Sequence, residues 1–393
     1  MSPPFPANEA PPAMPVASCR LCRRPLPRSP VLGYANMPAA AQHLPDAQDL
    51  ARDRGRSLEI FACGGCGLIQ LPGPPVPYFR EVIRAAAFSD EMREFRRVQF
   101  RAFVERYGLL GKKVLEIGCG RGEYLAILQQ SGVNAWGLEH STDSVAHCHA
   151  HRLQASQGFI ESDAYPIPEA PFAGFFMLSF LEHLPDPGMV LRGIAGNLAE
   201  DAVGMVEVPN FDFILRESLF SEFVTDHLCY FTKATLGMLL ALSGFEIVAC
   251  DEVWHDYILS AIVRRRPRSD LGRLSDRRAR LTQELQAFVR RFPPRRVAVW
   301  GAGHQAFALM ALAEIGGQVR YVVDSAPFKQ GKFTPATHVA IVPPATLATD
   351  PVDAVLVMAA AYADEVVRDL RRSHGNKLAI AVVRNDRLTM EPE

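Results

Sequence analysis

Short apolar runs alternate with segments of helical spacing from residue 113 onward, and this pattern predicts the order of the elements. A short apolar run bounded by turn residues is typical of a buried strand, whereas apolar positions three and four apart indicate a helix that covers a sheet. Strands that alternate with helices form an α/β sheet. The expected strands are residues 114–117, 133–138, 175–180 and 203–208, followed by a helix around 236–242 and strands out to 263.

A helix is expected to begin after Ser89, ahead of the first of these strands. The Ser89 hydroxyl can cap the first turn, and the acidic residues at 90 and 91 suit the positive end of the helix dipole. The helix can cover a ligand pocket in the following sheet or can simply face the core, and the pattern fits both roles. Its expected apolar stripe is Met92, Phe95, Val98 and Ala102.

The length and charge of the chain limit what it can be. A chain of 393 residues can form two or three domains, each with its own core. With 42 basic and 43 acidic side chains the formal net charge is −1, which does not favour nucleic acid as a partner. The Pro-rich residues 1–17 lack the basic and apolar regions of a signal peptide and are expected to form a disordered tail. No apolar stretch approaches a membrane span, so we expect a cytoplasmic protein without a membrane partner.

Four of the eight cysteines form two C-x-x-C pairs, Cys19 with Cys22 and Cys63 with Cys66. A tight turn can direct both sulfurs of such a pair at one metal ion, and four thiolates complete a tetrahedral zinc site. The 40 residues between the pairs exceed the usual zinc-ribbon spacing, so a redox pair or unliganded thiols also fit. We expect a small lobe at residues 18–77 that is held by structural zinc, because it contains few apolar residues.

The strand at 114–117 runs into a turn with three glycines, in the pattern E-x-G-C-G-x-G. Glycine lets a ligand approach the backbone closely, and an α/β sheet binds its ligands at the carboxyl ends of its strands. Glu139 ends the next strand, where a carboxylate can accept both hydroxyls of a ribose. The pattern resembles the first motif of class I S-adenosylmethionine (SAM) methyltransferases. This resemblance implies a SAM-binding set of Glu116, Gly118, Gly120, Gly122 and Glu139.

Two further segments are expected at the same edge of the sheet. Asp163 can meet the adenine amino group of the cofactor, or it can be a solvated loop acid. In the methyltransferase fold the end of the fourth strand faces the methyl donor, so Phe180, Glu182 and His183 are expected near the ligand. His183 can equally be a buried structural histidine.

The segment SEFVTDHLCYFT, residues 221–232, places an acid, a histidine and aromatic rings together. Histidine titrates near neutrality and can remove a proton, and a neighbouring carboxylate can orient or recharge it. Asp226, His227 and Tyr230 are therefore candidates for catalysis, although a histidine among aromatic residues can also be structural.

A second strand and turn unit follows a charged segment at 266–294, which we interpret as a helical connector. Residues 301–306, GAGHQA, lie between an expected strand at 297–300 and another at 321–323 that ends in Asp324. Taken alone, this is the pattern of a dinucleotide site with its ribose carboxylate. The polar loop that follows suits contacts to phosphate or sugar. The apolar side of the connector is expected at Leu274, Leu281, Leu285 and Phe288.

Together these segments resemble the sugar C-methyltransferases that act on nucleotide-linked 4-ketohexoses in deoxysugar biosynthesis. The resemblance runs from Cys19 to about Glu365 and lies in the order of the segments as well as in single motifs. It implies a class I SAM-methyltransferase core, which is Rossmann-like, at 78–265 after the zinc-binding lobe. It also implies a second, C-terminal Rossmann-like α/β domain at 295–393 that helps to hold a nucleotide sugar and not NAD. The matching stretches are Cys66–Leu71, Asp226–Phe231, Gly301–Gly303, Asp324, Pro327, Lys329–Lys332, Pro335 and Tyr362–Glu365.

The chemistry that this resemblance implies is a base-assisted methylation of carbon. His227 would remove the proton beside the C4 ketone, and the enolate carbon would attack the methyl group of SAM. The chain departs from the family at three places, because Asp226 replaces a glutamate, Val224 replaces a tyrosine and residues 82–88 replace an aromatic segment. The nearest candidates to replace the missing tyrosines are His183 and Tyr230.

Three other functions fit the sequence. The chain could transfer the methyl group to oxygen or nitrogen of a sugar or secondary-metabolite acceptor, it could be a zinc-bearing scaffold that binds SAM without catalysis, or its second turn could bind NAD. The expected partner is a small nucleotide sugar, and the expected assembly is a monomer or a weak homo-oligomer.

Overall fold

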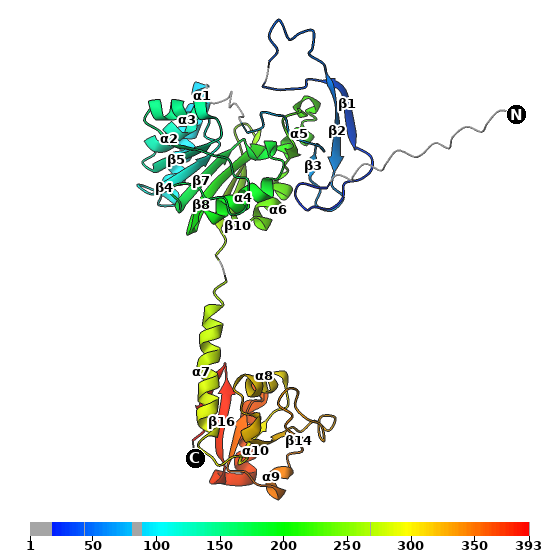
Figure 1. The fold of residues 1–393 in the computed structure, drawn as a ribbon, viewed down its shortest axis with the longest axis vertical. Helices are drawn as coiled ribbons and strands as arrows, with labels where there is room; N and C mark the ends of the chain where they lie inside the picture. The colour runs from blue at the N-terminus through cyan, green and yellow to red at the C-terminus, as the bar shows by residue number, and fades with distance from the viewer. Residues whose placement is uncertain (1–17, 43, 81–88, 268, 393) are drawn as a thin grey trace, which may run out of the picture. The chain divides into compact units, whose positions relative to one another are not determined.

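The chain forms two compact units, Met1–Pro267 and Arg268–Glu393. The expected disordered tail at 1–17 and the segment at 82–88 lie outside the described residues. Within the described ranges no helix combines the length and the apolar character needed to cross a membrane. The computed structural model (Figure 1) describes residues 18–42, 44–80, 89–267 and 269–392.

The first unit is built on a seven-stranded sheet with one apolar core on each face. In spatial order the strands are β10 (Phe245–Val253), β11 (Ile258–Arg265), β8 (Leu198–Pro209), β7 (Phe172–Leu178), β4 (Lys113–Ile117), β5 (Asn134–Glu139) and β6 (Gln154–Gln157). Neighbours from β8 to β6 are parallel, and β11 is antiparallel to both β8 and β10. One face is covered by α1 (Asp90–Arg106), α2 (Glu123–Gln130) and α3 (Thr142–Ala150), and the other by α4 (Pro187–Gly196), α5 (Phe211–Arg216) and α6 (Lys233–Leu242).

The strands of this sheet follow the apolar runs of the sequence. The expected strands at 114–117, 133–138 and 203–208 fall on β4, β5 and the second half of β8, because strands covered on both faces are mostly apolar. The fourth strand differs from the expected range, since β7 begins at Phe172 and ends at Leu178. Phe180 therefore lies past the end of the strand, at the edge where ligands bind.

Helix α1 faces the core, but with a different side from the expected one. Val98 is 58% exposed and Ala102 is also exposed, whereas Arg96 and Phe100 are buried. Arg96 is buried because its guanidinium forms an ion pair with Glu207 of β8. The periodicity of apolar residues cannot reveal such a pair. The expected stripe is confirmed at Met92 and Phe95, which contact the core, and is wrong at Val98 and Ala102.

The cysteine-bearing lobe completes its own sheet with a strand from far along the chain. Its strands β1 (Leu32–Met37), β2 (Arg56–Ala62) and β3 (Ile69–Gln70) are joined by β9 (Cys229–Tyr230), in the order β1-β2-β3-β9. Because β9 begins two residues after His227, the lobe and the candidate catalytic segment share one sheet.

The second unit is also an α/β sheet. Its strand order is β14 (Ile341–Val342), β13 (Val319–Val323), β12 (Val297–Trp300), β15 (Ala354–Val357), β16 (Ala379–Arg384) and β17 (Arg387–Met390), and only β17 is antiparallel to its neighbour. The helices are α7 (Gly272–Val289), α8 (His304–Leu312), α9 (Thr346–Thr349) and α10 (Ala363–His374). Helix α7, in the expected connector, packs into the core of this unit through Leu281, Leu285 and Phe288, whereas Leu274 is exposed.

Candidate active site and cofactor pocket

The turn after β4 brings the glycine loop against the end of β5. Gly118 and Gly122 have φ angles of +63° and +90°, a region that side chains disfavour. A Cβ atom at position 118 would also lie 3.3 Å from the Phe180 ring. The Gly120 N–H donates a hydrogen bond of 2.9 Å to Glu139 Oε2. The structure therefore brings the glycines, Glu139 and Phe180 together, as the sequence predicts.

The two acidic residues of the expected set occupy different places. Glu139 closes β5, is 4% exposed, and accepts the Ser141 N–H on Oε1 at 2.9 Å. Glu116 is fully buried within β4. Glu139 is thus the carboxylate at the carboxyl edge of the sheet, where the hydroxyls of a ribose can reach it.

A narrow apolar cleft opens beside this loop, at the carboxyl ends of β4, β5, β6 and β7. Phe159 forms one wall, and the guanidinium carbon of Arg80 lies 4.8 Å from its ring centroid. Arg80 also pairs with Glu161 at 2.9 Å. An apolar slot with an aromatic wall suits a flat base such as adenine. The cleft is lined by Arg80, Ile117, Gly118, Leu138, His140, Gly158, Phe159, Ile160, Phe180 and Val190.

Asp163 does not line this cleft. Its carboxylate forms an ion pair of 2.8 Å with Arg192 on the surface, and both side chains are about half exposed. Phe159, four residues before Asp163, and Arg80 line the cleft without having been predicted from the sequence.

Two histidines from separate segments meet beside the cleft. His183 lies in a single 3₁₀ turn, Leu181–His183, which follows Phe180 directly. Its Nδ1 is 3.0 Å from the backbone oxygen of Asp226, which can only accept, so Nδ1 carries the proton and Nε2 is left with a lone pair. The rings of His183 and His227 meet edge to face, with centroids 4.8 Å apart.

Burial keeps both histidines neutral. It lowers the pKa of His183 to about 4, and burial together with the neighbouring His183 lowers the pKa of His227 to about 3. The His227 side chain remains partly exposed whereas His183 is 3% exposed. Of the two rings, His227 is therefore the one that a substrate can reach.

The carboxylate of Asp226 is held by the cysteine-bearing lobe. Its Oδ1 accepts the Tyr78 hydroxyl and the Ala41 N–H, both at 3.0 Å. Its Oδ2 is buried and has no hydrogen-bond partner among the residues that the structure describes. Burial and the bond to Asp226 raise the pKa of Tyr78, which stays protonated and donates. Sequence reasoning missed Tyr78, whose partner lies 148 positions away.

Tyr230 has a structural contact in this arrangement. Its hydroxyl accepts the N–H of Val224 at 3.0 Å and donates to the Val224 oxygen at 3.1 Å, which closes the loop that carries Asp226 and His227. Burial raises the pKa of Tyr230. The ring lies 6.1 Å from that of His227, so Tyr230 walls the site while its hydroxyl is occupied.

A carboxylate completes a three-residue cluster around the histidines. Glu182 Oε1 lies 3.9 Å from His183 Nε2, and one ligand atom each from Glu182, His183 and His227 lie within 4.8 Å of one another. Two neutral imidazoles and a carboxylate can bind a divalent metal ion, or they can accept and donate a proton during a reaction.

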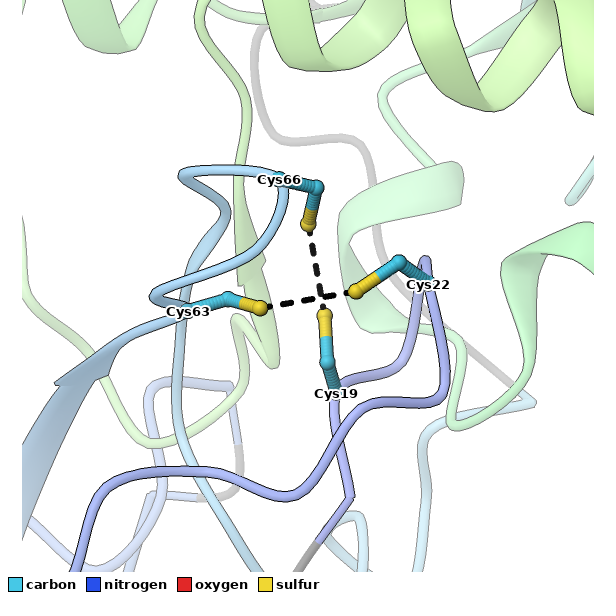
Figure 2. Close-up of side chains that lie close together, drawn as sticks. All are labelled: Cys19, Cys22, Cys63 and Cys66. Atoms are coloured by element: carbon cyan, nitrogen blue, oxygen red, sulfur yellow. Dashed lines mark hydrogen bonds between the residues drawn. The ribbon is translucent and has the colours of Figure 1, made fainter.

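The four paired cysteines converge on one point (Figure 2). Cys19 and Cys66 have sulfurs 3.5 Å apart, as have Cys22 and Cys63, and all four sulfurs lie within 4.8 Å of one another. Sulfurs around a tetrahedral zinc ion lie about 3.8 Å apart when the Zn–S bonds are about 2.3 Å. The residues therefore fit a closed four-thiolate metal site.

Two family models match this chain. A methyltransferase domain matches residues 92–250, and a C-methyltransferase C-terminal domain matches residues 271–382. The chain belongs to the SAM-dependent C-methyltransferases. SAM is accordingly its methyl donor, and the glycine loop with Glu139 lies at the edge of the sheet where this fold binds its cofactor.

The relatives of this C-methyltransferase match it over different lengths. The C-methyltransferase NovU of Streptomyces niveus is 24% identical over 388 residues, 90% of this chain and 92% of its own. The ubiquinone biosynthesis O-methyltransferase of Pseudomonas aeruginosa (strain UCBPP-PA14) is 37% identical over 94 residues, only 22% of this chain and 40% of its own. A solved SAM-dependent methyltransferase from Clostridium acetobutylicum ATCC 824 covers 46% of this chain and 94% of its own, at 10% identity and a TM-score of 0.38.

The second unit of this C-methyltransferase repeats the strand and turn arrangement. Asp324 follows β13, and its Oδ2 accepts the Ala302 N–H at 2.8 Å and the Lys329 ammonium at 2.9 Å. Burial acts to raise the pKa of Asp324, but Lys329 and the backbone donors outweigh it and lower that pKa. A cleft beside this turn is lined mainly by Trp300–Gln305, Asp324, Ser325, Lys329, Met358–Ala360 and Tyr362.

Proposed function

We propose that this C-methyltransferase transfers the methyl group of SAM to the carbon beside a ketone on a nucleotide-linked sugar of deoxysugar biosynthesis. The main support is the contact between two neutral imidazoles, His227 and His183, the latter in the turn that follows Phe180 of the cleft. A proton next to a ketone is acidic enough for a neutral imidazole to remove, whereas a proton on an isolated C–H bond is not.

His227 is the proposed base. SAM, when bound, supplies an electrophilic methyl group. The free ring nitrogen of His227 takes the proton, and the electron pair of the C–H bond moves into an enolate. The enolate carbon then forms the new C–C bond as the methyl–sulfur bond breaks. The proton on His227 passes to solvent after the product leaves.

Asp226 and Tyr78 are proposed to support this transfer. A buried imidazolium needs a negative charge nearby, and Asp226 acts to raise the pKa of His227 against burial. Tyr78 and the Ala41 N–H hold one oxygen of Asp226 in place, and the other is buried without a hydrogen-bond partner among the described residues. Tyr78 is thus our candidate to replace the tyrosine that the family carries at the position of Val224.

The other two parts of the chain have proposed roles in binding. We propose that Cys19, Cys22, Cys63 and Cys66 hold one structural zinc ion, because four thiolates leave no open position for chemistry. We also propose that the cleft beside Asp324 in the second unit binds the nucleotide part of the substrate. Lys329 lines that cleft, and its ammonium group can contact a phosphate group of the substrate.

Deuterium exchange tests this function directly. The protein, saturated with S-adenosylhomocysteine in D₂O, is incubated with a panel of nucleotide ketosugars, and exchange at the carbon beside the ketone is followed by NMR. Full turnover with SAM is read as a mass gain of one methyl group. We expect His227→Asn to slow both exchange and methylation by about 10²- to 10⁴-fold.

His151→Asn is the matched control, because this exposed histidine ends α3 and lies outside the site. It should leave both rates unchanged. Methyl gain without exchange would replace this function by transfer to oxygen or nitrogen. Absence of both with every ketosugar would refute the proposed acceptor class.

A further inference from the structure

Part of the candidate catalytic segment, β9, forms a strand in the sheet of the cysteine-bearing lobe. Strand β3 pairs with β9 antiparallel, with Ile69 opposite Tyr230 and Gln70 opposite Cys229. The pairing continues one step further, since the Leu71 N–H donates to the Leu228 oxygen at 3.0 Å. The backbone that follows His227 therefore takes its position from β3.

Gln70 joins this strand to the metal-binding turn. Its side chain is 1% exposed, Nε2 donates to Cys19 Sγ at 3.2 Å, and Oε1 accepts the Arg20 N–H at 3.0 Å. The turn that carries Cys63 and Cys66 precedes β3 in the chain. The Cys63 N–H donates to the Leu68 oxygen at 2.9 Å, next to the start of β3. One side chain and one short stretch of backbone thus fix β3 to both cysteine pairs.

The path continues from β9 to both histidines. The Leu228 N–H donates to the Glu182 oxygen at 2.8 Å, next to His183. From the opposite side, the Thr225 hydroxyl donates to the Pro38 oxygen of the lobe at 2.7 Å. A two-residue strand makes few bonds of its own, so its neighbours determine where it lies.

We propose that Gln70 is a positioning residue for methyl transfer, which transmits the geometry of the four-cysteine site through β3 and β9 to Asp226 and His227. This inference rests on the proposed function of His227. A displacement of about 1 Å at a reacting group can slow a reaction by about 10²-fold, so a modest loosening of β9 is enough to matter. The cysteine site then controls the rate without touching the substrate.

The test is Gln70→Leu, which keeps similar volume and loses both hydrogen bonds. We expect one equivalent of zinc by elemental analysis and an unchanged SAM affinity by calorimetry. We expect kcat to fall by about tenfold or more with little change in the KM for SAM, as for a displaced base. We also expect faster amide hydrogen exchange in the peptide that spans residues 226–231, with unchanged exchange in β4 and β5.

Arg23→Ala is the matched control. Arg23 lies in the same lobe and pairs with Asp186, the N-cap of α4, at 2.5 Å. This contact is not part of the path from Gln70 to β9. It should leave kcat and the exchange of residues 226–231 unchanged. If both variants lose kcat equally, docking of the lobe as a whole is responsible and the role of Gln70 is refuted.

Two outcomes separate this inference from the proposed function. The role of Gln70 would be overturned if residues 226–231 of a folded, zinc-loaded Gln70→Leu protein exchanged their amide hydrogens as slowly as in the wild type. This result holds whatever the substrate is. If instead no ketosugar is turned over, the proposed function fails, and the amide exchange still decides whether Gln70 positions residues 226–231. Should Gln70→Leu fail to fold, wild-type protein treated with a zinc chelator gives the same readout, and unchanged exchange at 226–231 after zinc loss would overturn the inference.

Discussion

The two units of this protein carry the same strand and turn arrangement with a different charge balance. In the first unit, Glu139 accepts the backbone N–H groups of Gly120 and Ser141. In the second, Asp324 accepts the backbone N–H of Ala302 and, on the same oxygen, the ammonium of Lys329. The turns are alike, but only the second carboxylate carries a cation at hydrogen-bond distance in this comparison.

This difference separates two kinds of ligand. A carboxylate held by backbone donors keeps negative charge to offer to ribose hydroxyls. A carboxylate that is paired with lysine is electrically balanced, and the paired ammonium can still donate a hydrogen bond to a phosphate group. The glycine turn with Glu139 therefore suits SAM in the first unit, and the Asp324–Lys329 pair supports the proposed phosphate contact in the second.

The largest expected effect concerns the ion pairs that hold each unit together. Glu207 and Arg96 are completely buried, whereas Asp353 and Arg296 in the second unit are each about 40% exposed. Glu207→Ala leaves a buried guanidinium unpaired and should lower the free energy of unfolding by about 3–5 kcal/mol. Asp353→Ala should change it little, because solvent screens an exposed pair. Urea denaturation followed by circular dichroism measures both, and equal losses would contradict the contrast.

The next largest effect is on SAM binding. Glu139→Ala removes hydrogen bonds to a charged group, each worth about 1.5–3 kcal/mol, and should weaken SAM binding by about 100-fold. Asp324→Ala should leave the SAM affinity unchanged. Titration calorimetry with both variants tests this directly. Similar losses in the two would mean that the second unit also contributes to the cofactor site.

The pH profile of kcat/KM should reveal the state of His227. The base must be unprotonated, and burial together with His183 lowers its pKa to about 3. The acid limb of the profile should therefore lie well below pH 6.5, the ordinary value for histidine. Asp226→Asn removes a charge that raises this pKa, so the limb should move further down in pH. A limb that does not move in Asp226→Asn would show that this carboxylate does not act on the pKa of the base.

The smallest expected effect is on the stability of the second unit. The folded pKa of Asp324 is lowered, so its contribution is present above the unfolded value of 3.8 and is lost as pH falls through the folded value. Lys329→Ala should therefore destabilise β12 and β13 slightly at pH 7 and less at about pH 3, where protonation begins to remove the charge of the carboxyl. Amide exchange in those strands at both pH values measures it. An equal loss at both would point to packing by the lysine stem.

Features that depend on neighbours in sequence could be predicted. The Ser89 hydroxyl caps α1 by accepting the Met92 N–H, and the glycine turn with Glu139 forms as its spacing indicates. The paired cysteines converge because each C-x-x-C turn fixes two sulfurs locally, and the closure of the two turns on each other completes the site.

Features that depend on distant partners could not be predicted. The buried face of α1 includes Arg96, which only its pairing with Glu207 makes tolerable. Tyr78 acquires its role from Asp226, and β9 acquires its partner from the other end of the unit. No periodicity or spacing encodes these pairs, because each residue alone resembles an ordinary surface or loop residue.

The strand shared by the lobe and the catalytic segment also limits how this protein can be recombined. A cut near residue 77 looks in sequence like a boundary between exchangeable modules. In the fold it strips β9 of its neighbour β3 and leaves an unpaired strand edge, which is a site for aggregation. A lobe taken from a relative should therefore give a folded chimera only when the segment around β9 is exchanged with it. The lobe and this segment have to be exchanged together.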